Sequence, residues 1–348
     1  MEGTTMANAE RPTWNPLGLH DMLRGYVKTS LLRAGFELRV FDHLAAGPVD
    51  AATVADRVGA SERGTRILLD ALAAIGLART GEGGYRLVEG TEPYLLSTGD
   101  RYFGGAVKLG AGDWEWDAQK RLAEAVRKGG SVMDTDALTP EFDYWMDFAQ
   151  HTSWFNNGAA VLMAEQLGDW ARAREQVDVL DVACSHGGYG FNLAQRAPGV
   201  RIWGVDWPNV LEVTRRNAER LGLADRVGYI PGDMFEVPLG GPYDLVLLTN
   251  VLHHFSAGRA TELLTRLAGV LKPGGRIAVV GHTYDEGETP ETEPLPFMFS
   301  VIMLIQSAQG ESHSVGTYRG MLTSAGFSEP QVYAREGVMH RLFIADRA

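Results

Sequence analysis

The sequence predicts an α/β protein in which a doubly wound, mainly parallel sheet follows a smaller, mainly helical module. Two observations support this fold class. Short helical patterns with few strands fill the first part of the chain. The second half then contains five apolar runs of strand length, at residues 179–182, 200–206, 227–230, 243–250 and 275–281. Because a parallel sheet is covered on both faces, its strands read as nearly continuous apolar runs of this kind.

The N-terminal module reads as three helices followed by a two-stranded wing. Apolar residues recur at helical spacing over residues 30–44. Two more helices are expected to begin after Asp50 and Ser61, because both residue types are good N-caps. The short runs 77–80 and 84–88 flank a glycine-rich turn and predict paired strands. Together these elements predict a helix-turn-helix with a wing.

The segment between the module and the sheet is helical and aromatic. It contains Trp114 and Trp116, an amphipathic pattern over residues 117–126, and an aromatic helix expected over residues 141–155. Flexible linkers rarely carry two tryptophans, so we expect this segment to pack. The whole chain is therefore divided into a disordered leader at 1–15, a winged-helix module at 16–98, a helical linker at 99–155 and a sheet domain at 156–348.

The first predicted strand of the sheet ends near Asp181 and runs directly into a turn of small residues. Such a turn lets a backbone approach a nucleotide-like cofactor. Ala183 and Ser185 stand where glycines are usual, and turns of this kind serve NAD, ATP and S-adenosylmethionine alike. The next strand ends on Asp206, where doubly wound sheets place a carboxylate that accepts from ribose hydroxyls. The turn and the second acid together predict a nucleotide-like cofactor.

The later strands add three further motifs. The third strand leads into Gly-Asp-Met-Phe at residues 232–235, and the fourth leads into Asn-Val-Leu-His-His-Phe at 250–255. The fifth follows the turn Leu-Lys-Pro-Gly-Gly at 271–275. In this order the motifs resemble class I S-adenosylmethionine-dependent methyltransferases. With the N-terminal module, the chain resembles small-molecule O-methyltransferases of the plant caffeate and bacterial polyketide-tailoring type, from about Pro16 to the end.

This resemblance implies a Rossmann-like, seven-stranded sheet with a winged-helix dimerisation domain, and a homodimer. It implies S-adenosylmethionine as the cofactor and S-adenosylhomocysteine as the product. Asp206 is expected at the ribose, Asp233 at the adenine amino group, and the fourth-strand residues at the methionine end. The residues assigned to the cofactor site are Asp181, Ala183, Ser185, Gly187, Asp206, Trp207, Gly232, Asp233, Met234, Phe235, Thr249 and Asn250.

Methylation of a hydroxyl oxygen needs a base that removes its proton, and histidine is the usual side chain for this task. His253 occupies the position at which the resembling enzymes carry their base in a Leu-His-Asp-Trp sequence. Here His254 replaces the aspartate, so we assign both histidines to catalysis. The fifth strand ends on Gly-His-Thr, with His282 where the plant enzymes commonly place a glutamate. The base is therefore expected to lack its usual carboxylate partner.

These departures leave a second mechanism open. His253, His254, His282 and His313 are all expected on the cofactor side of the sheet, and neutral imidazoles bind transition metals. A few relatives of the resembling family that C-methylate 2-oxo acids bind iron next to the acceptor. Metal-assisted C-methylation of a 2-oxo acid, with the metal held by His253, His254 and His313, is therefore the alternative to O-methylation. A third alternative is a tailoring enzyme that binds the cofactor without methylating.

A winged helix also raises the alternative of a transcription regulator that senses an adenosyl ligand. The expected recognition helix offers only Arg63 and Arg66 before an apolar run, which suits burial better than reading a DNA groove. The net charge of −12 also opposes a nucleic-acid or anionic-membrane partner. We expect neither nucleic acid nor membrane as a partner.

Aromatic and Met-rich segments are the candidates for the acceptor site. The run Pro296–Ile305 is too short for a bilayer, which needs ~20 apolar residues, and predicts a buried helix. The residues expected to touch the acceptor are Trp116, Trp145, Phe148, Phe299, Met303 and Gln306.

A single cysteine excludes an internal disulfide framework, and the first residues lack a secretion signal. The sequence thus predicts a cytoplasmic enzyme that methylates the oxygen of an aromatic or polyketide-like natural product.

Overall fold

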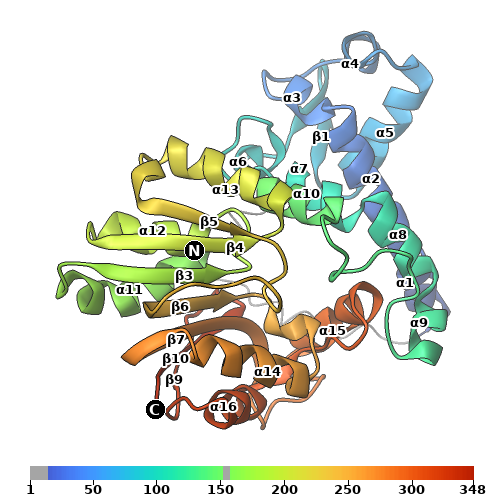
Figure 1. Cartoon of the computed structure of the whole chain (residues 1–348). Helices are drawn as coiled ribbons and strands as arrows, with labels where there is room; N and C mark the ends of the chain where they lie inside the picture. The colour runs from blue at the N-terminus through green and yellow to red at the C-terminus, as the bar shows by residue number, and fades with distance from the viewer. Residues whose placement is uncertain (1–14, 152–156) are drawn as a thin grey trace. The chain divides into compact units, whose positions relative to one another are not determined.

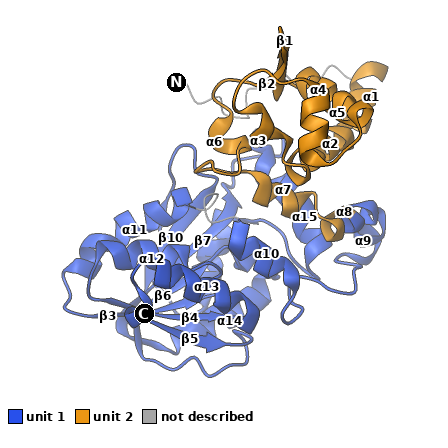
Figure 2. Ribbon diagram, turned by 90° about the horizontal axis from the view of Figure 1, so that it is seen from above, with its two compact units in different colours: residues 1–9, 117–348 blue, residues 10–116 orange. Residues whose placement is uncertain are grey.

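A computed structural model describes residues 15–151 and 157–348 (Figure 1). Most of the predicted leader 1–15 lies outside the described residues. The chain divides into two compact units, whose described residues are 15–116 and 117–348 without 152–156 (Figure 2). We call them the N-terminal and C-terminal units and describe each by itself. The division falls inside the segment 99–155, and the finer domain boundaries expected from the sequence stay predictions.

The N-terminal unit is a winged helix extended by short helices. Asp50 accepts a hydrogen bond from Thr53 N at 2.8 Å and caps one helix, and the Ser61 hydroxyl caps the next. The wing pairs Ala78 with Leu87 in antiparallel register. Its elements are α1 (Pro16–Leu23), α2 (Gly25–Glu37), α3 (Val40–Leu44), α4 (Ala51–Val58), α5 (Glu62–Ala74), β1 (Ala78–Gly81), β2 (Gly84–Leu87), α6 (Glu92–Leu95), α7 (Gly104–Gly110) and α8 (Asp113–Lys120).

Two helices expected from the sequence are interrupted. The pattern over 30–44 is divided into α2 and α3 by Arg39, whose φ of 53° places it in the left-handed region. This break lets Val40, Phe41 and Leu44 enter the core, where each is at most 1% exposed. The pattern over 117–126 is likewise divided at Arg121, which separates α8 from α9 (Leu122–Lys128). Periodicity alone does not mark these breaks, because the apolar spacing continues through them.

The C-terminal unit is a sheet with the order β5-β4-β3-β6-β7-β10-β9. The first five strands of this order run parallel, and β10 pairs antiparallel with both β7 and β9. The two-residue β8 pairs with β7 as an eighth strand, one more than expected. The strands are β3 (Val177–Val182), β4 (Val200–Asp206), β5 (Val227–Pro231), β6 (Tyr243–Thr249), β7 (Leu271–Tyr284), β8 (His313–Ser314), β9 (Gln331–Tyr333) and β10 (His340–Asp346).

Helices cover both faces of this sheet, as Figure 1 shows. Val179, Ile202 and Leu247 face a core shared with α11, α12 and α13. Leu180, Val246 and Val279 face the opposite core, shared with α14 and α16. The remaining elements are α10 (Asp143–His151), α11 (Asn157–Arg172), α12 (Gly188–Arg196), α13 (Pro208–Arg220), η2 (Ala224–Arg226), η3 (Leu252–His254), α14 (Ala257–Ala268), α15 (Pro294–Gln306) and α16 (Val315–Ser324).

The alternation of the two cores explains how the sequence positions a site. The inner strands β3 and β6 are almost wholly buried, so polar side chains that could reach a ligand gather near the strand ends. Asp206 and Thr249 end β4 and β6, and the turn at Ala183 follows β3. Because these strands are parallel, their carboxyl ends meet at one edge of the sheet, where such folds bind ligands.

Candidate active site

The turn after β3 is held in an unusual backbone conformation. Ala183 and Ser185 have φ of 53° and 51°, and Gly187 has φ of 78°. The first two cost strain that glycine would avoid, because side chains rarely adopt positive φ. The strain is offset by contacts: Ser185 N donates to Asp206 Oδ2 at 2.8 Å, and Thr214 Oγ1 donates to Ser185 O at 2.5 Å. Contacts with Asp206 and Thr214 therefore hold the turn in this conformation at the carboxyl end of β3.

His186 and Cys184, whose roles the sequence left open, both stabilise this turn. Gly188 N donates to His186 Nδ1 at 2.9 Å, and burial lowers the pKa of His186 to about 4. Cys184 is 5% exposed, and a Cβ added at Gly204 of β4 would lie 2.9 Å from its sulfur. Burial raises the pKa of the thiol well above its usual value, which disfavours a nucleophilic thiolate.

Asp181 and Asn250 bring unpartnered polar atoms to the strand edge. Asp181 Oδ2 accepts from Gly190 N at 3.3 Å, while its Oδ1 has no hydrogen-bond partner within the described residues. Burial raises the pKa of Asp181 to about 8. Asn250 Nδ2 donates to the Tyr189 hydroxyl at 2.9 Å, which leaves Asn250 Oδ1 unpartnered there as well. Buried acceptors without donors are costly, so these two atoms indicate a ligand that donates hydrogen bonds.

Asp206 lies across the turn with both oxygens engaged. Its Oδ2 accepts from Ser185 N and its Oδ1 accepts from Trp207 N at 2.8 Å. Burial raises the pKa of Asp206 to about 6, and the two backbone donors act in the opposite direction. A carboxylate oxygen can accept a second hydrogen bond, so these contacts orient Asp206 and leave it able to accept another donor. Trp207 packs with Trp145 against α13.

The Gly-Asp-Met-Phe motif forms the turn that follows β5. Gly232 N donates to Asp206 O at 2.9 Å, which joins this turn to the end of β4. Asp233 Oδ1 accepts from Phe235 N at 2.8 Å, and both Met234 and Phe235 pack against the core of the unit. The guanidinium of Arg259 lies over the Phe235 ring, 3.8 Å from its centroid. The motif is thus a compact turn, joined by its backbone to the end of β4 that carries Asp206.

The histidines after β6 gather with others from distant segments. The ring centroid of His253 lies 4.7 Å from that of His254 and 5.9 Å from that of His282. His282 in turn lies 4.1 Å from His340, its register partner on β10. We call these four residues the histidine cluster. His340 was not among the predicted site residues.

Burial makes the cluster neutral. His253, His254 and His340 are at most 6% exposed. Burial, followed by the neighbouring imidazoles, holds the pKa of His253 well below its usual value. Burial also lowers the pKa of His254 and of His340 to about 4, and that of His282 to about 3. A buried imidazole without its proton can accept one, which is the state a general base needs.

The three histidines of the metal alternative do not converge. The Nε2 of His313 lies 2.9 Å from Phe255 O and is engaged there. Across residues 15–151 and 157–348, no group of three His, Cys, Asp or Glu side chains is arranged to hold a metal ion. The residues present thus do not fit the proposed metal site, and we derive no step through one.

Two family models match the chain. An O-methyltransferase domain matches residues 119–328, and an O-methyltransferase dimerisation domain matches residues 20–96. The chain is 32% identical to acetylserotonin O-methyltransferase of Mus musculus, over 94% of this chain and 87% of that protein. It belongs to the O-methyltransferase family.

Other relatives agree with this family. The enzyme is 28% identical to 3-hydroxy-5-methyl-1-naphthoate 3-O-methyltransferase of Streptomyces sahachiroi, over 90% of each chain. Its fold matches the crystal structure of human N-acetylserotonin methyltransferase in complex with SAM (S-adenosylmethionine), with a TM-score of 0.82 and 27% identity over 98% of this chain and 99% of that one. This O-methyltransferase therefore uses S-adenosylmethionine and acts on a small molecule, which disfavours the regulator alternative.

The residues that the sequence assigned to the acceptor are divided between the units. Trp116 packs against the core of the N-terminal unit. In the C-terminal unit, Trp145 makes an edge contact with His254, with centroids 5.3 Å apart, and lies 5.7 Å from Phe148. Phe299 lies 4.9 Å from His253 and 4.2 Å from His282. The cluster is thus walled by aromatic rings from α10 and α15.

Met303 and Gln306 lie further along α15. Met303 is 2% exposed, and Gln306 Nε2 donates to the Tyr144 hydroxyl at 3.0 Å. Both side chains are engaged within the unit, so their contact with an acceptor stays a prediction. Phe299 is the member of the α15 set that reaches the histidines.

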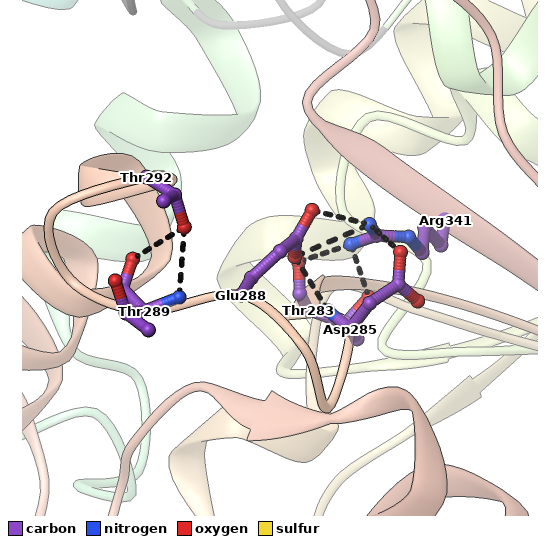
Figure 3. Close-up of polar contacts among 6 residues, drawn as sticks. All are labelled: Thr283, Asp285, Glu288, Thr289, Thr292 and Arg341. Carbon is purple, nitrogen blue, oxygen red and sulfur yellow. Dashed lines mark hydrogen bonds and ion pairs between the residues drawn. The ribbon is translucent and has the colours of Figure 1, made fainter.

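The loop between β7 and α15 is held by a charged network (Figure 3). Arg341 of β10 donates to Thr283 O at 2.6 Å and to Asp285 Oδ2 at 2.7 Å, and its ion pair with Glu288 spans 3.4 Å. Thr292 Oγ1 accepts from Thr289 N at 2.9 Å just before the helix begins. This network fixes the entry of α15, the helix that carries Phe299 to the cluster.

Among the described residues, no helix is long and apolar enough to cross a bilayer.

Proposed function

We propose that this enzyme methylates a hydroxyl oxygen of an aromatic or polyketide-like small molecule, with His253 as the general base. The observation that carries the proposal is the state of His253: the ring is buried, neutral at pH 7, and its Nδ1 has no partner in the described part of the chain. It follows directly after β6, whose end also carries Thr249 and Asn250. Aromatic rings around it favour a flat, apolar acceptor.

The cofactor is proposed to lie along the strand edge. Asp206 is expected to accept from the ribose hydroxyls and Asp233 from the adenine amino group. The unpartnered oxygens of Asp181 and Asn250 suit the ammonium of the methionine part, and Thr249 adjoins them. S-adenosylmethionine supplies a methyl group on a positively charged sulfonium. The backbone of Ala183, Ser185, Gly187 and Gly232 and the side chains of Trp207, Met234 and Phe235 complete this proposed site.

His254 has a supporting role in the proposal. Its ring adjoins that of His253 and makes the edge contact with Trp145, so it links the base to the aromatic wall. Because burial lowers its pKa to about 4, it adds no positive charge beside His253 near neutral pH. Its unpartnered Nδ1 is a second position where an acceptor polar group could be held.

The His253→Ala variant tests the base. Loss of a general base should lower turnover by about 10²–10⁴-fold, while cofactor affinity stays within a factor of about two. Turnover is read by the mass of the methylated product, and cofactor binding by calorimetry. His43→Ala, in α3 of the N-terminal unit, is the matched control and should retain activity. A His253→Ala enzyme that turns over like the wild type would remove His253 from this role.

The homodimer is proposed to form through the first two helices. Leu19, Met22, Leu23 and Tyr26 recur at helical spacing and are 54% to 68% exposed. They lie within or next to the segment matched by the dimerisation domain. A second copy of this chain would bury this apolar face. A cytoplasmic location, which rests on cysteine usage, stays a prediction.

A further inference from the structure

The base of this enzyme lies among imidazoles. His254 comes from the same short helix η3, His282 from the end of β7, and His340 from β10 behind it. The register of the sheet sets the last pair opposite each other. Phe299 of α15 stands edge-on to His253 and against His282. The sequence places two histidines, His254 and His282, where the resembling enzymes carry acids, and the structure places each of them beside His253.

The segment after α15 does not supply the missing carboxylate. Glu311 N donates to His253 O at 2.9 Å, which ties this segment to η3. The Glu311 side chain is 66% exposed, and its nearest basic contact is with His313 Nδ1 at 4.0 Å. In the described residues of the C-terminal unit, the groups that influence His253 are thus all imidazoles: His254, His282, His340 and His313.

This environment limits which protons His253 can take. A protonated His253 is a buried cation, and a carboxylate beside it would offset that cost. Neutral imidazoles offset it far less. Burial and the neighbouring rings already hold the pKa of His253 well below its usual value. An ordinary phenol has a pKa of ~10, so transfer of its proton to His253 is strongly unfavourable.

We propose that the acceptor is an acidic hydroxyl, meaning a vinylogous acid such as a hydroxyquinone or the enol of a β-dicarbonyl, and that the histidine cluster selects it over an ordinary phenol. This inference rests on the proposed function of His253. The O–H bond breaks, its proton forms an N–H bond on His253, and the electron pair stays on oxygen. That oxygen then bonds to the methyl carbon as the carbon–sulfur bond breaks and its electron pair returns to sulfur.

Two probes of equal ring size test the selection. A hydroxynaphthoquinone is acidic, and a naphthol is not. We expect kcat/KM for the hydroxynaphthoquinone to exceed that for the naphthol by about 100-fold or more, because proton transfer follows the acidity of the donor. Equal values, or a preference for the naphthol, would overturn the proposal.

Binding gives a second readout that does not depend on turnover. The hydroxynaphthoquinone anion and its neutral form absorb at different visible wavelengths. Titration into the protein loaded with S-adenosylhomocysteine therefore reports both affinity and protonation state. Tight binding of the acidic probe and weak binding of the naphthol support the proposal, even where neither probe is methylated. Failure of the acidic probe to bind better than the naphthol counts against it.

A matched pair at His282 tests the cause. His282→Glu introduces a carboxylate into the cluster, and His282→Gln changes the side chain without a charge. The carboxylate should stabilise protonated His253, so the Glu variant should gain at least about tenfold on naphthol relative to the Gln variant. The acid limb of its pH–rate profile should also shift upward. Equal activity of the two variants on naphthol would contradict the electrostatic cause.

The outcomes separate this inference from the proposed function. If His253→Ala remains inactive while both probes react equally well, His253 is the base and only the selection is wrong. If His253→Ala is fully active, the proposed function of His253 fails first. The wild-type probe comparison needs no variant, so a poorly folded His282→Glu does not remove the test.

Discussion

Asp181 is a buried carboxyl group, and its burial costs free energy in the free enzyme. The side chain is 1% exposed and receives one hydrogen bond, from Gly190 N. A Cβ at Gly190 would lie 2.8 Å from Asp181 Oδ2, so the small residue at the start of α12 lets the helix backbone reach the acid. Burial is the largest cause of the raised pKa, and Asp206 adds to it. In the free enzyme, burial without a positively charged neighbour therefore favours the protonated form of Asp181.

The raised pKa predicts a pH dependence of stability. The unfolded pKa of an Asp is ~3.9, and folding raises that of Asp181 to about 8. The contribution of Asp181 to the free energy of unfolding is therefore full below about pH 4. It declines above that pH and is lost as the pH rises through about 8. Asp206, with a pKa raised to about 6, acts mainly at the lower end of this window.

We expect the cofactor-free Asp181→Asn variant to lose less stability between pH 6 and pH 8 than the wild type. The difference in the Tm decrease should be on the order of 5 °C. Scanning fluorimetry at the two pH values measures it. Asp225→Asn, at an exposed position in η2, is the control and should follow the wild type. Parallel curves for all three proteins would show that Asp181 does not titrate in this range.

At the scale of elements, the β7–α15 loop connects the sheet to α15, the helix whose Phe299 contacts the histidine cluster. Arg341 and His340 are neighbours on β10, and each supports a different part of the site. His340 contacts the ring of His282, and Arg341 holds Thr283, Asp285 and Glu288. The Arg341 side chain is 17% exposed, so its ion pairs are shielded from solvent more than those at the surface.

Arg341→Met should loosen this loop without unfolding the sheet. Removing the guanidinium takes one donor from the Thr283 carbonyl and from the carboxylates of Asp285 and Glu288, which should lower the local opening free energy by about 1–3 kcal/mol. Hydrogen exchange of residues 285–293 should then become faster, while exchange in β3 stays slow. Arg276→Met is the control, because Arg276 pairs with Asp346 across the same two strands. Equal effects of both variants would argue against a local anchor.

The sequence predicted the strand-end acids well and the histidine cluster incompletely. Asp206 could be placed because a parallel strand buried on both faces carries its polar residue at its end. His340 could not, because its pairing with His282 depends on the antiparallel register of β10. Alternation within one strand does not show which residue of another strand lies opposite.

Helix breaks were missed for a similar reason. The left-handed Arg39 is not marked by glycine or proline, and the apolar spacing runs through it without interruption. The break is caused by packing, since it turns Val40 and Phe41 into the core. Local patterns identify such helices, but tertiary contacts decide where one ends.

At the scale of the whole molecule, the exposed apolar face of α1 and α2 predicts association. Leu19→Glu combined with Leu23→Glu places two carboxylates on this face and should convert the dimer to a monomer, because burying unpaired charges is costly. Light scattering after gel filtration measures the mass. Val126→Glu is the matched control, at a position in α9 that is also 62% exposed. A double variant that remains dimeric would place the interface elsewhere.

Cys184 provides a natural site at which thiol labelling can measure local opening of the protein. The chain has one thiol, and it lies beneath the strained turn in the space that Gly204 leaves open. A reagent in solution can react with that sulfur only when the structure around it opens, because the side chain is buried. The rate of thiol labelling of the native protein therefore reports local opening around Cys184, with no added probe and no second cysteine to confuse the signal.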